Sequence, residues 1–257
     1  MIEALQIAQT GLKATQEWLD VISNNISNMQ TAGFKKSGVT FTDLVKGGQE
    51  INQKASVTDS ESTGLGTQLD ATYTNFSAGS IQATGQALDF AISGNGFLEV
   101  QLADGQFAYT RLGKLAFNQD GRLVTASGYP LSDSIYIPPD VQSITILPNG
   151  SVEIRVPGNQ DSIEVGQLNL ATFNDPQALT SMGQGLYTLA EGSELPTIKK
   201  PGEEGAGSIL QGFVEGSNVD LVEEMTSLVL AQRAYQLNAR LVQVMDSIME
   251  TTNNIRR

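Results

Sequence analysis

The chain has no cysteine and no histidine among its 257 residues. Without cysteine it can form no disulfide and has no thiolate nucleophile, and without either residue it cannot build a zinc site of the Cys/His kind. The absence of histidine also removes Ser-His-Asp catalysis. Composition alone therefore excludes several common kinds of enzyme.

Charged side chains are scarce and lean to one sign. They make up 17% of the chain, and 15 Lys and Arg residues against 28 Asp and Glu residues give a formal net charge of −13. Nucleic acid and anionic membranes repel such a chain. No apolar run approaches the ~18 residues of a membrane span, and the first ten residues lack the basic and apolar regions of a signal peptide. We therefore expect no nucleic-acid partner, no integral membrane segment and no cleaved signal peptide.

Both ends of the chain carry apolar residues at helical spacing. The first predicted helix runs from residue 1 to about residue 31, and Gly33 with Lys35 and Lys36 is typical of a helix carboxyl end. The second is predicted to begin at Ser217-Asn-Val-Asp220, which has the form of a capping box, and to run for roughly 30 residues or about 45 Å. The apolar stripes consist of Leu5, Leu12, Leu19, Ile22, Ile26 and Met29 in the first helix and Leu221, Met225, Leu228, Tyr235, Leu241, Met245 and Ile248 in the second.

A narrow apolar stripe cannot bury its surface alone, so each helix needs a partner. The two helices can pair as an antiparallel hairpin, can pack between copies of the chain, or can do both. Alternatively, the stripes are ordinary core faces of a helical layer. Their length favours assembly, because such helices overshoot a compact domain of this size. Asn25 flanks the first stripe and Asn238 lies on the second, where each either caps locally or fixes the register between packed helices.

The middle of the chain consists of short β-like runs separated by turn signals. The runs cover residues 90–92, 97–100, 107–109, 115–117, 123–125, 143–147, 152–156 and 165–170. Asp104-Gly105, Asp120-Gly121 and Asn149-Gly150 stand between such runs and predict tight hairpins. The predicted fold class is α+β, with two long terminal helices forming a coiled-coil-like α-helical layer and an inserted antiparallel β domain.

This pattern also predicts a division of the chain. We expect a helical assembly domain over residues 1–45 and 215–257. An extended polar connector is expected over 46–79, because its first part is polar and shows neither helical nor strand periodicity. The antiparallel β domain is expected over 80–214.

Motifs for catalysis or cofactor binding are weak. Gly94-Asn-Gly-Phe97 lacks the third glycine of a dinucleotide fingerprint and no βαβ pattern surrounds it, so we interpret it as a β turn. Asp89 and Glu99 are two carboxylates whose spacing does not favour a glycosidase. We therefore expect no enzyme activity, no catalytic residues, no cofactor and no metal.

Three motifs, in order along the chain, resemble the signatures of bacterial flagellar rod and hook proteins. The first is Ser23-Asn-Asn-Ile-Ser-Asn-Met-Gln-Thr-Ala-Gly-Phe-Lys35, in which Ile26 and Ser27 replace the family's usual Leu and Ala. The second comprises residues 94–100, Tyr109-Thr-Arg-Leu-Gly113 and 121–125, and the third comprises residues 215–225 and 231–239. The resemblance spans nearly the whole chain. The length of the chain and its first twelve residues are similar to the subtype that forms the distal rod. Proximal rod and hook-type axial proteins are the alternatives within the family.

The resemblance implies a structural subunit of the flagellar basal body. Such subunits leave the cell through the flagellar type III export apparatus without a cleaved signal peptide. They polymerise into the periplasm-spanning rod, a hollow shaft that transmits motor torque to the hook. The implied partners are copies of the chain in a helical homopolymer, the proximal rod and hook proteins, and the surrounding P and L ring proteins. Asn25 and the stripe residues are expected to pack between subunits. A secreted β-domain binding module is the alternative from another class.

Overall fold

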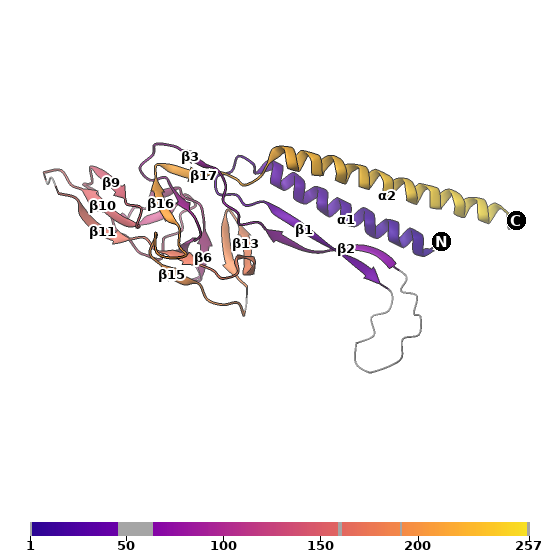
Figure 1. The fold of residues 1–257 in the computed structure, drawn as a ribbon, viewed down its shortest axis with the longest axis horizontal. Helices are drawn as coiled ribbons and strands as arrows, with labels where there is room; N and C mark the ends of the chain where they lie inside the picture. Colours follow the sequence, from indigo (N-terminus) through magenta and orange to yellow (C-terminus); the bar gives the residue numbers. More distant parts are fainter. Residues whose placement is uncertain (1, 46–63, 159–160, 191, 256–257) are drawn as a thin grey trace. The chain divides into compact units, whose positions relative to one another are not determined.

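The computed structural model describes residues 2–45, 64–158, 161–190 and 192–255, and Figure 1 shows it as a ribbon. Helix α1 spans Ile2–Ser27 and helix α2 spans Leu221–Ile255. The strands are β1 Ser37–Val45, β2 Gly64–Thr74, β3 Ile81–Ala83, β4 Phe90–Ser93, β5 Leu98–Gln101, β6 Phe107–Thr110, β7 Leu115–Phe117, β8 Leu123–Thr125, β9 Ser143–Ile146, β10 Ser151–Arg155, β11 Ile163–Gln167, β12 Leu170–Thr172, β13 Leu179–Gly183, β14 Leu186–Leu189, β15 Thr197–Lys199, β16 Ser208–Gln211 and β17 Phe213–Glu215. A 3-10 helix at Pro176–Ala178 precedes β13. The fold class is α+β, as predicted.

The described residues fall into two compact units. Those within Met1–Ser27, Ser37–Tyr73 and Asp220–Arg257 form the helical unit, and those within Asn28–Lys36 and Thr74–Val219 form the β unit. The connector expected over 46–79 needs correction, since β2 occupies much of its second half and pairs with β1. The polar residues of β2 form a strand because β1 supplies the backbone partners that an isolated segment lacks. Residues 75–79 of that prediction form neither helix nor strand and belong to the β unit, and residues 46–63 lie outside the described residues.

Helix α1 ends at Ser27, earlier than the predicted end near residue 31. The Thr31 N–H donates to the Asn28 carbonyl at 3.0 Å in a turn, and Gly33 then adopts a φ of +69°. Asparagine favours such turns over helix interiors. Met29, which the sequence assigns to the apolar stripe, therefore lies outside the helix in a segment that belongs to the β unit.

Helix α2 begins where Asp220 caps it. Its Oδ1 accepts the N–H groups of Val222 at 2.8 Å and Glu223 at 3.2 Å, which satisfies donors that the first helical turn leaves without partners. The prediction that Ser217 is the capping residue is wrong. Its hydroxyl accepts the Val219 N–H in the turn before the helix.

In the helical unit, α1 and α2 lie side by side and antiparallel (Figure 1). Strand β1 packs along α1. The rings of Trp18 in α1 and Phe41 in β1 contact each other edge to face, with 6.0 Å between their centroids. Gly66 of β2 approaches α1 so closely that a Cβ there would overlap the Thr10 hydroxyl. These contacts make α1 the element that both α2 and the β1–β2 pair cover.

The β unit contains a four-stranded sheet ordered β13-β14-β6-β5 and a three-stranded sheet ordered β11-β10-β9, with strand pairs β16-β4, β17-β3, β12-β15 and β7-β8 around them. Its main core includes Phe90, Leu98, Val100, Val152, Leu168, Leu170 and Ile209, each at most 1% exposed. A second cluster stacks aromatic rings edge to face, with Phe97 beside Phe76, Phe173 and Tyr187. Two apolar cores therefore fill the β unit.

The predicted strands and hairpins of this unit are confirmed. Strands β4 to β11 begin within two residues of the predicted runs. Asp104-Gly105, Asp120-Gly121 and Asn149-Gly150 connect antiparallel neighbours, and their glycines adopt φ of +84°, +77° and +85°. The run at 165–170 is divided between β11 and β12. Local turn chemistry was thus sufficient to locate these elements.

Candidate functional site

The contact between α1 and α2, called the helix seam below, is set by two polar side chains. A Cβ on Gly11 would come within 2.9 Å of Asn238 Nδ2, so a residue without a side chain faces the amide. At the other end of the seam, Asn25 Nδ2 donates to Glu224 Oε2 at 3.3 Å and to the Ser37 carbonyl at 2.8 Å. Asn25 Oδ1 also accepts the Ser37 N–H at 2.9 Å. This buried amide therefore ties α1, α2 and the start of β1 together.

The predicted stripe residues differ in how far the chain itself covers them. Ile22 and Asn25 are buried. Leu5, Leu12, Leu19, Ile26, Met29, Leu228 and Met245 are half-buried, and Leu221, Met225, Tyr235, Leu241 and Ile248 are exposed. The seam within one chain thus buries only part of the apolar surface that the two helices carry.

Helix α2 carries a further apolar surface, called the outer stripe below. It consists of Leu230, Leu237, Leu241, Val244 and Ile248, which are between 43% and 61% exposed. At 100° per residue they lie within an arc of about 60°, whose centre is about 110° from Ala231 around the helix. Ala231 is fully buried. Sequence reasoning missed three of these residues, because it followed one stripe at heptad spacing where α2 has two.

The β unit holds a buried ion cluster formed by Lys35, Arg111 and Glu215. Lys35 Nζ donates to Glu215 Oε1 at 2.6 Å and to the Ser77 carbonyl at 2.7 Å. Arg111 Nε donates to Glu215 Oε2 at 2.9 Å. The Gly79 N–H also donates to Glu215 Oε1 at 2.8 Å. One carboxylate is therefore shared by two cations.

The guanidinium of Arg111 has further partners in the β unit. Its Nη2 donates to the carbonyls of Ile92 at 3.3 Å and Gly94 at 2.9 Å. Gly94 and Gly96 adopt positive φ in a bend that connects β4 to β5, which places this glycine motif between two strands. The bend presents the Gly94 carbonyl to the ion cluster.

Burial and charge pull the pKa values of this cluster in opposite directions. Burial lowers the pKa of Lys35 and the positive charge of Arg111 adds to that effect, while the hydrogen bond to Glu215 opposes it. Burial alone would raise the pKa of Glu215, but Arg111, Lys35 and the Gly79 N–H together hold it below its ordinary value. The two short ion-pair contacts set one carboxylate against two cationic side chains, so by formal charge the cluster carries one net positive charge.

Sequence reasoning missed all three members of this cluster. Lys35 was assigned with Lys36 to a helix end, but its side chain is fully buried in the β unit. Each member lies in one of the three motifs described above: Lys35 ends the first, Arg111 is central in the second and Glu215 begins the third. One signal in the sequence could have indicated them. Charged residues are scarce in this chain, yet each of the three motifs contains one of these charged side chains.

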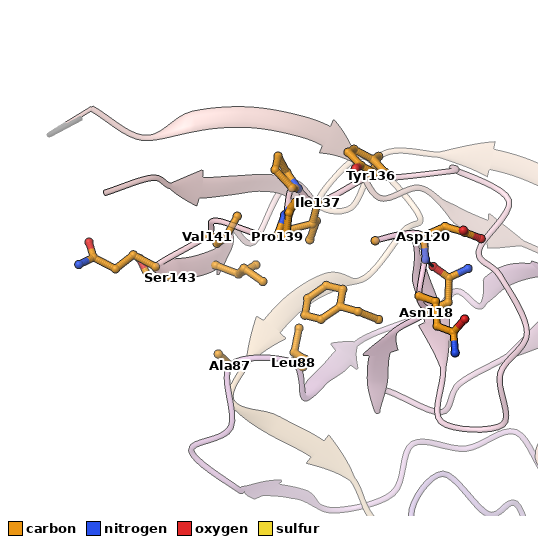
Figure 2. Close-up of a pocket in the computed structure, with 15 residues that line it drawn as sticks. Ala87, Leu88, Asn118, Asp120, Tyr136, Ile137, Pro139, Val141 and Ser143 are labelled. Atoms are coloured by element: carbon orange, nitrogen blue, oxygen red, sulfur yellow. Dashed lines mark hydrogen bonds between the residues drawn. The ribbon is translucent and has the colours of Figure 1, made fainter. Parts of the chain in front are cut away.

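The β unit also contains a pocket of about 710 Å³, shown in Figure 2. Leu88, Ile137 and Val141 line its apolar side, and Asn118 and Asp120 lie at the turn between β7 and β8. Among its described lining residues Asp120 is the one carboxylate, where acid–base hydrolysis of a glycoside needs two. The pocket therefore does not supply a catalytic pair.

No helix among the described residues is long and apolar enough to cross a bilayer.

Comparison with known proteins gives matches along most of the chain. Residues 5–35 match the family described as flagella basal body rod protein. Residues 91–167 match the flagellar hook protein FlgE/F/G D1 domain, and residues 210–255 match the flagellar basal body rod FlgEFG protein C-terminal family.

Individual relatives resemble the chain over its full length. The flagellar basal-body rod protein FlgG of Bacillus subtilis is 37% identical, with 100% of both chains covered. FlgG of Borreliella burgdorferi is 36% identical with the same coverage. FlgG of Buchnera aphidicola subsp. Schizaphis graminum is 37% identical over 99% of this chain and 100% of its own.

Proposed function

The chain belongs to the family of flagellar basal-body rod and hook proteins, and we propose that it polymerises into the distal part of the rod. It is a structural component of the basal-body rod. In the proposed rod, copies of the chain form a hollow shaft through their terminal helices. This shaft crosses the periplasm and transmits motor torque to the hook.

The observation that carries the proposal is the outer stripe of α2. Five large apolar side chains are about half exposed along one line of the helix, whereas single exposed apolar residues are ordinary on a protein surface. Completing the burial of each contributes about 1 kcal/mol. A neighbouring copy that covers the stripe therefore stabilises the assembly by several such increments.

The positions of two exposed apolar surfaces on α2 favour an open polymer over a closed dimer. The helix seam is an internal contact, but the outer stripe and the exposed residues Leu221, Met225 and Tyr235 lie on nearly opposite sides of α2, so one copy presents two different surfaces to its surroundings. Contacts between unlike surfaces repeat from copy to copy and generate a helical filament when the rotation does not close. The exposed stripe residues Leu221, Met225 and Tyr235 would pack at these contacts, whereas Asn25 is buried within the chain and holds the helix seam.

The finer parts of the proposal follow from family membership. The partners would be the proximal rod and hook proteins, the P and L ring proteins around the rod, and the flagellar type III export apparatus, which would export the chain without a cleaved signal peptide. The proposed role is mechanical and involves no enzyme activity. It requires repeated subunit contacts, and the outer stripe supplies a surface for them.

The proposal can be tested on the purified chain with a paired variant of the outer stripe. Leu237→Gln with Leu241→Gln keeps good helix formers but removes two apolar contacts. We expect the concentration needed for polymerisation, followed by sedimentation and electron microscopy, to rise at least about tenfold. The control, Gln232→Ala with Gln243→Ala, changes the opposite flank of α2 and should polymerise like the unaltered chain. Equal polymerisation of both variants would contradict the proposal.

A further inference from the structure

The ion cluster joins two parts of the β unit that are far apart in the sequence. Arg111, Glu215 and Gly79 all lie within residues 74–219. Lys35 comes from residues 28–36, called the docking segment below, which connects the end of α1 to the start of β1. The docking segment is thus the means by which the amino-terminal signature contacts the rest of the β unit.

Residues 74–219 contain a complete ion pair without Lys35. The Arg111 guanidinium donates to Glu215 and to two backbone carbonyls, and Glu215 also accepts the Gly79 N–H. The pair is neutral, and both carboxylate oxygens have a donor. Lys35 is therefore not needed to compensate a buried charge; it adds a second cation to a balanced pair.

Removal of the Lys35 ammonium would leave each of its acceptors with another partner. The Ser77 carbonyl also accepts from Asn218 Nδ2 at 3.2 Å, and Glu215 Oε1 retains the Gly79 N–H. Burial of a cation removes its hydration, which costs free energy. Replacing buried ionic groups by apolar groups of similar size therefore often leaves the stability of a fold unchanged or increases it. An uncharged side chain of similar length at position 35 would therefore leave the contact as stable as Lys35 does or more stable.

Neutral hydrogen bonds also hold the docking segment. The Gly33 N–H donates to the Glu215 carbonyl at 2.7 Å, and the Lys36 N–H donates to Asn218 Oδ1 at 2.7 Å. The Asn75 N–H donates to the Lys36 carbonyl at 2.9 Å. These bonds specify where the segment docks, independently of the Lys35 charge.

We propose that Lys35 makes this docking reversible: the docking segment leaves and rejoins the β unit in the free subunit and stays docked in the assembled rod. The energetic reason is the surplus positive charge that docking buries. The second half of the statement rests on the proposed function, since packing of α1 between copies would hold the adjoining segment in place. The Lys35 position then couples assembly of the helices to completion of the β unit.

The test is amide hydrogen exchange at Gly33 and Lys36 in the full-length, unassembled chain. Lys35→Met should slow exchange at both amides about tenfold or more, because docking no longer buries a cation. The control Lys114→Met removes a positive charge from an exposed side chain of the same unit and should leave both rates unchanged. Amides of the β4–β16 pair report whether the β unit remains folded.

Unchanged or faster exchange in Lys35→Met would overturn the proposal, and so would loss of protection in the β4–β16 pair. Polymerisation is scored separately by sedimentation. If exchange slows as expected but the chain never polymerises, the proposed function is refuted and reversible docking in the free subunit is retained. If the chain polymerises but exchange is unchanged, the docking proposal is refuted and the proposed function is retained.

Discussion

Replacement of Glu215 by glutamine removes the one negative charge of the buried cluster while keeping its size. Lys35 Nζ and Arg111 Nε, now 2.6 Å and 2.9 Å from the carboxylate, would both lose their charged partner. Breaking a buried ion pair by removing one partner costs about 3–5 kcal/mol, and here two cations lose the same partner. We therefore expect Glu215→Gln to lower the free energy of unfolding of the β unit by at least the lower end of that range.

Urea unfolding followed by near-ultraviolet circular dichroism of tyrosine measures this loss, since four of the six tyrosines lie in the β unit. The double variant Lys35→Met with Glu215→Gln leaves one buried cation and should recover part of the lost stability. Glu153→Gln, a glutamate of β10 outside the cluster, is the matched control. A Glu215→Gln protein within about 1 kcal/mol of the unaltered chain, or a double variant no more stable than the single one, would refute the reasoning.

Three further outcomes are expected. Gly11→Leu should destabilise the helical unit by about 1–3 kcal/mol because the new side chain overlaps Asn238. Tryptophan fluorescence during unfolding measures the lost stability. Adding Asn238→Ala to the same chain should recover part of that stability. Asp220→Ala removes the cap of α2 and should cost about 1 kcal/mol by the same assay, whereas an unchanged midpoint would contradict the capping role. Burial raises the pKa values of Tyr109 and Tyr187 from 10.0 to about 12, so these groups lose their protons first in the unfolded chain. The free energy of unfolding should therefore fall as pH rises from 10 to 12, and a rise or no change over that interval would contradict the assignment.

The elements that the sequence predicted well depend on local signals. Asp-Gly and Asn-Gly pairs fix tight turns through the positive φ of their glycines, so three hairpins could be placed without knowledge of the fold. The long helix α2 also follows from local periodicity. Its start was assigned to Ser217 instead of Asp220 because both side chains are chemically able to cap.

The ion cluster could not be predicted because its members lie at positions 35, 111 and 215 and meet only in the folded β unit. Lys35 stands beside Lys36 after an apolar stripe, where two lysines commonly mark a helix end. The strand β2 was missed for a related reason: its pairing with β1 depends on a partner distant along the chain, which periodicity does not report. Long-range partners thus separate the predicted features from those that were missed.

Electron microscopy of basal bodies from a host whose gene is deleted and replaced by the Leu237→Gln, Leu241→Gln variant tests the central proposal most directly. We expect basal bodies without the distal part of the rod, and complete rods when the unaltered gene or the Gln232→Ala, Gln243→Ala control is restored. Complete rods in the deletion strain, where no second copy of the gene exists, would contradict the proposed function.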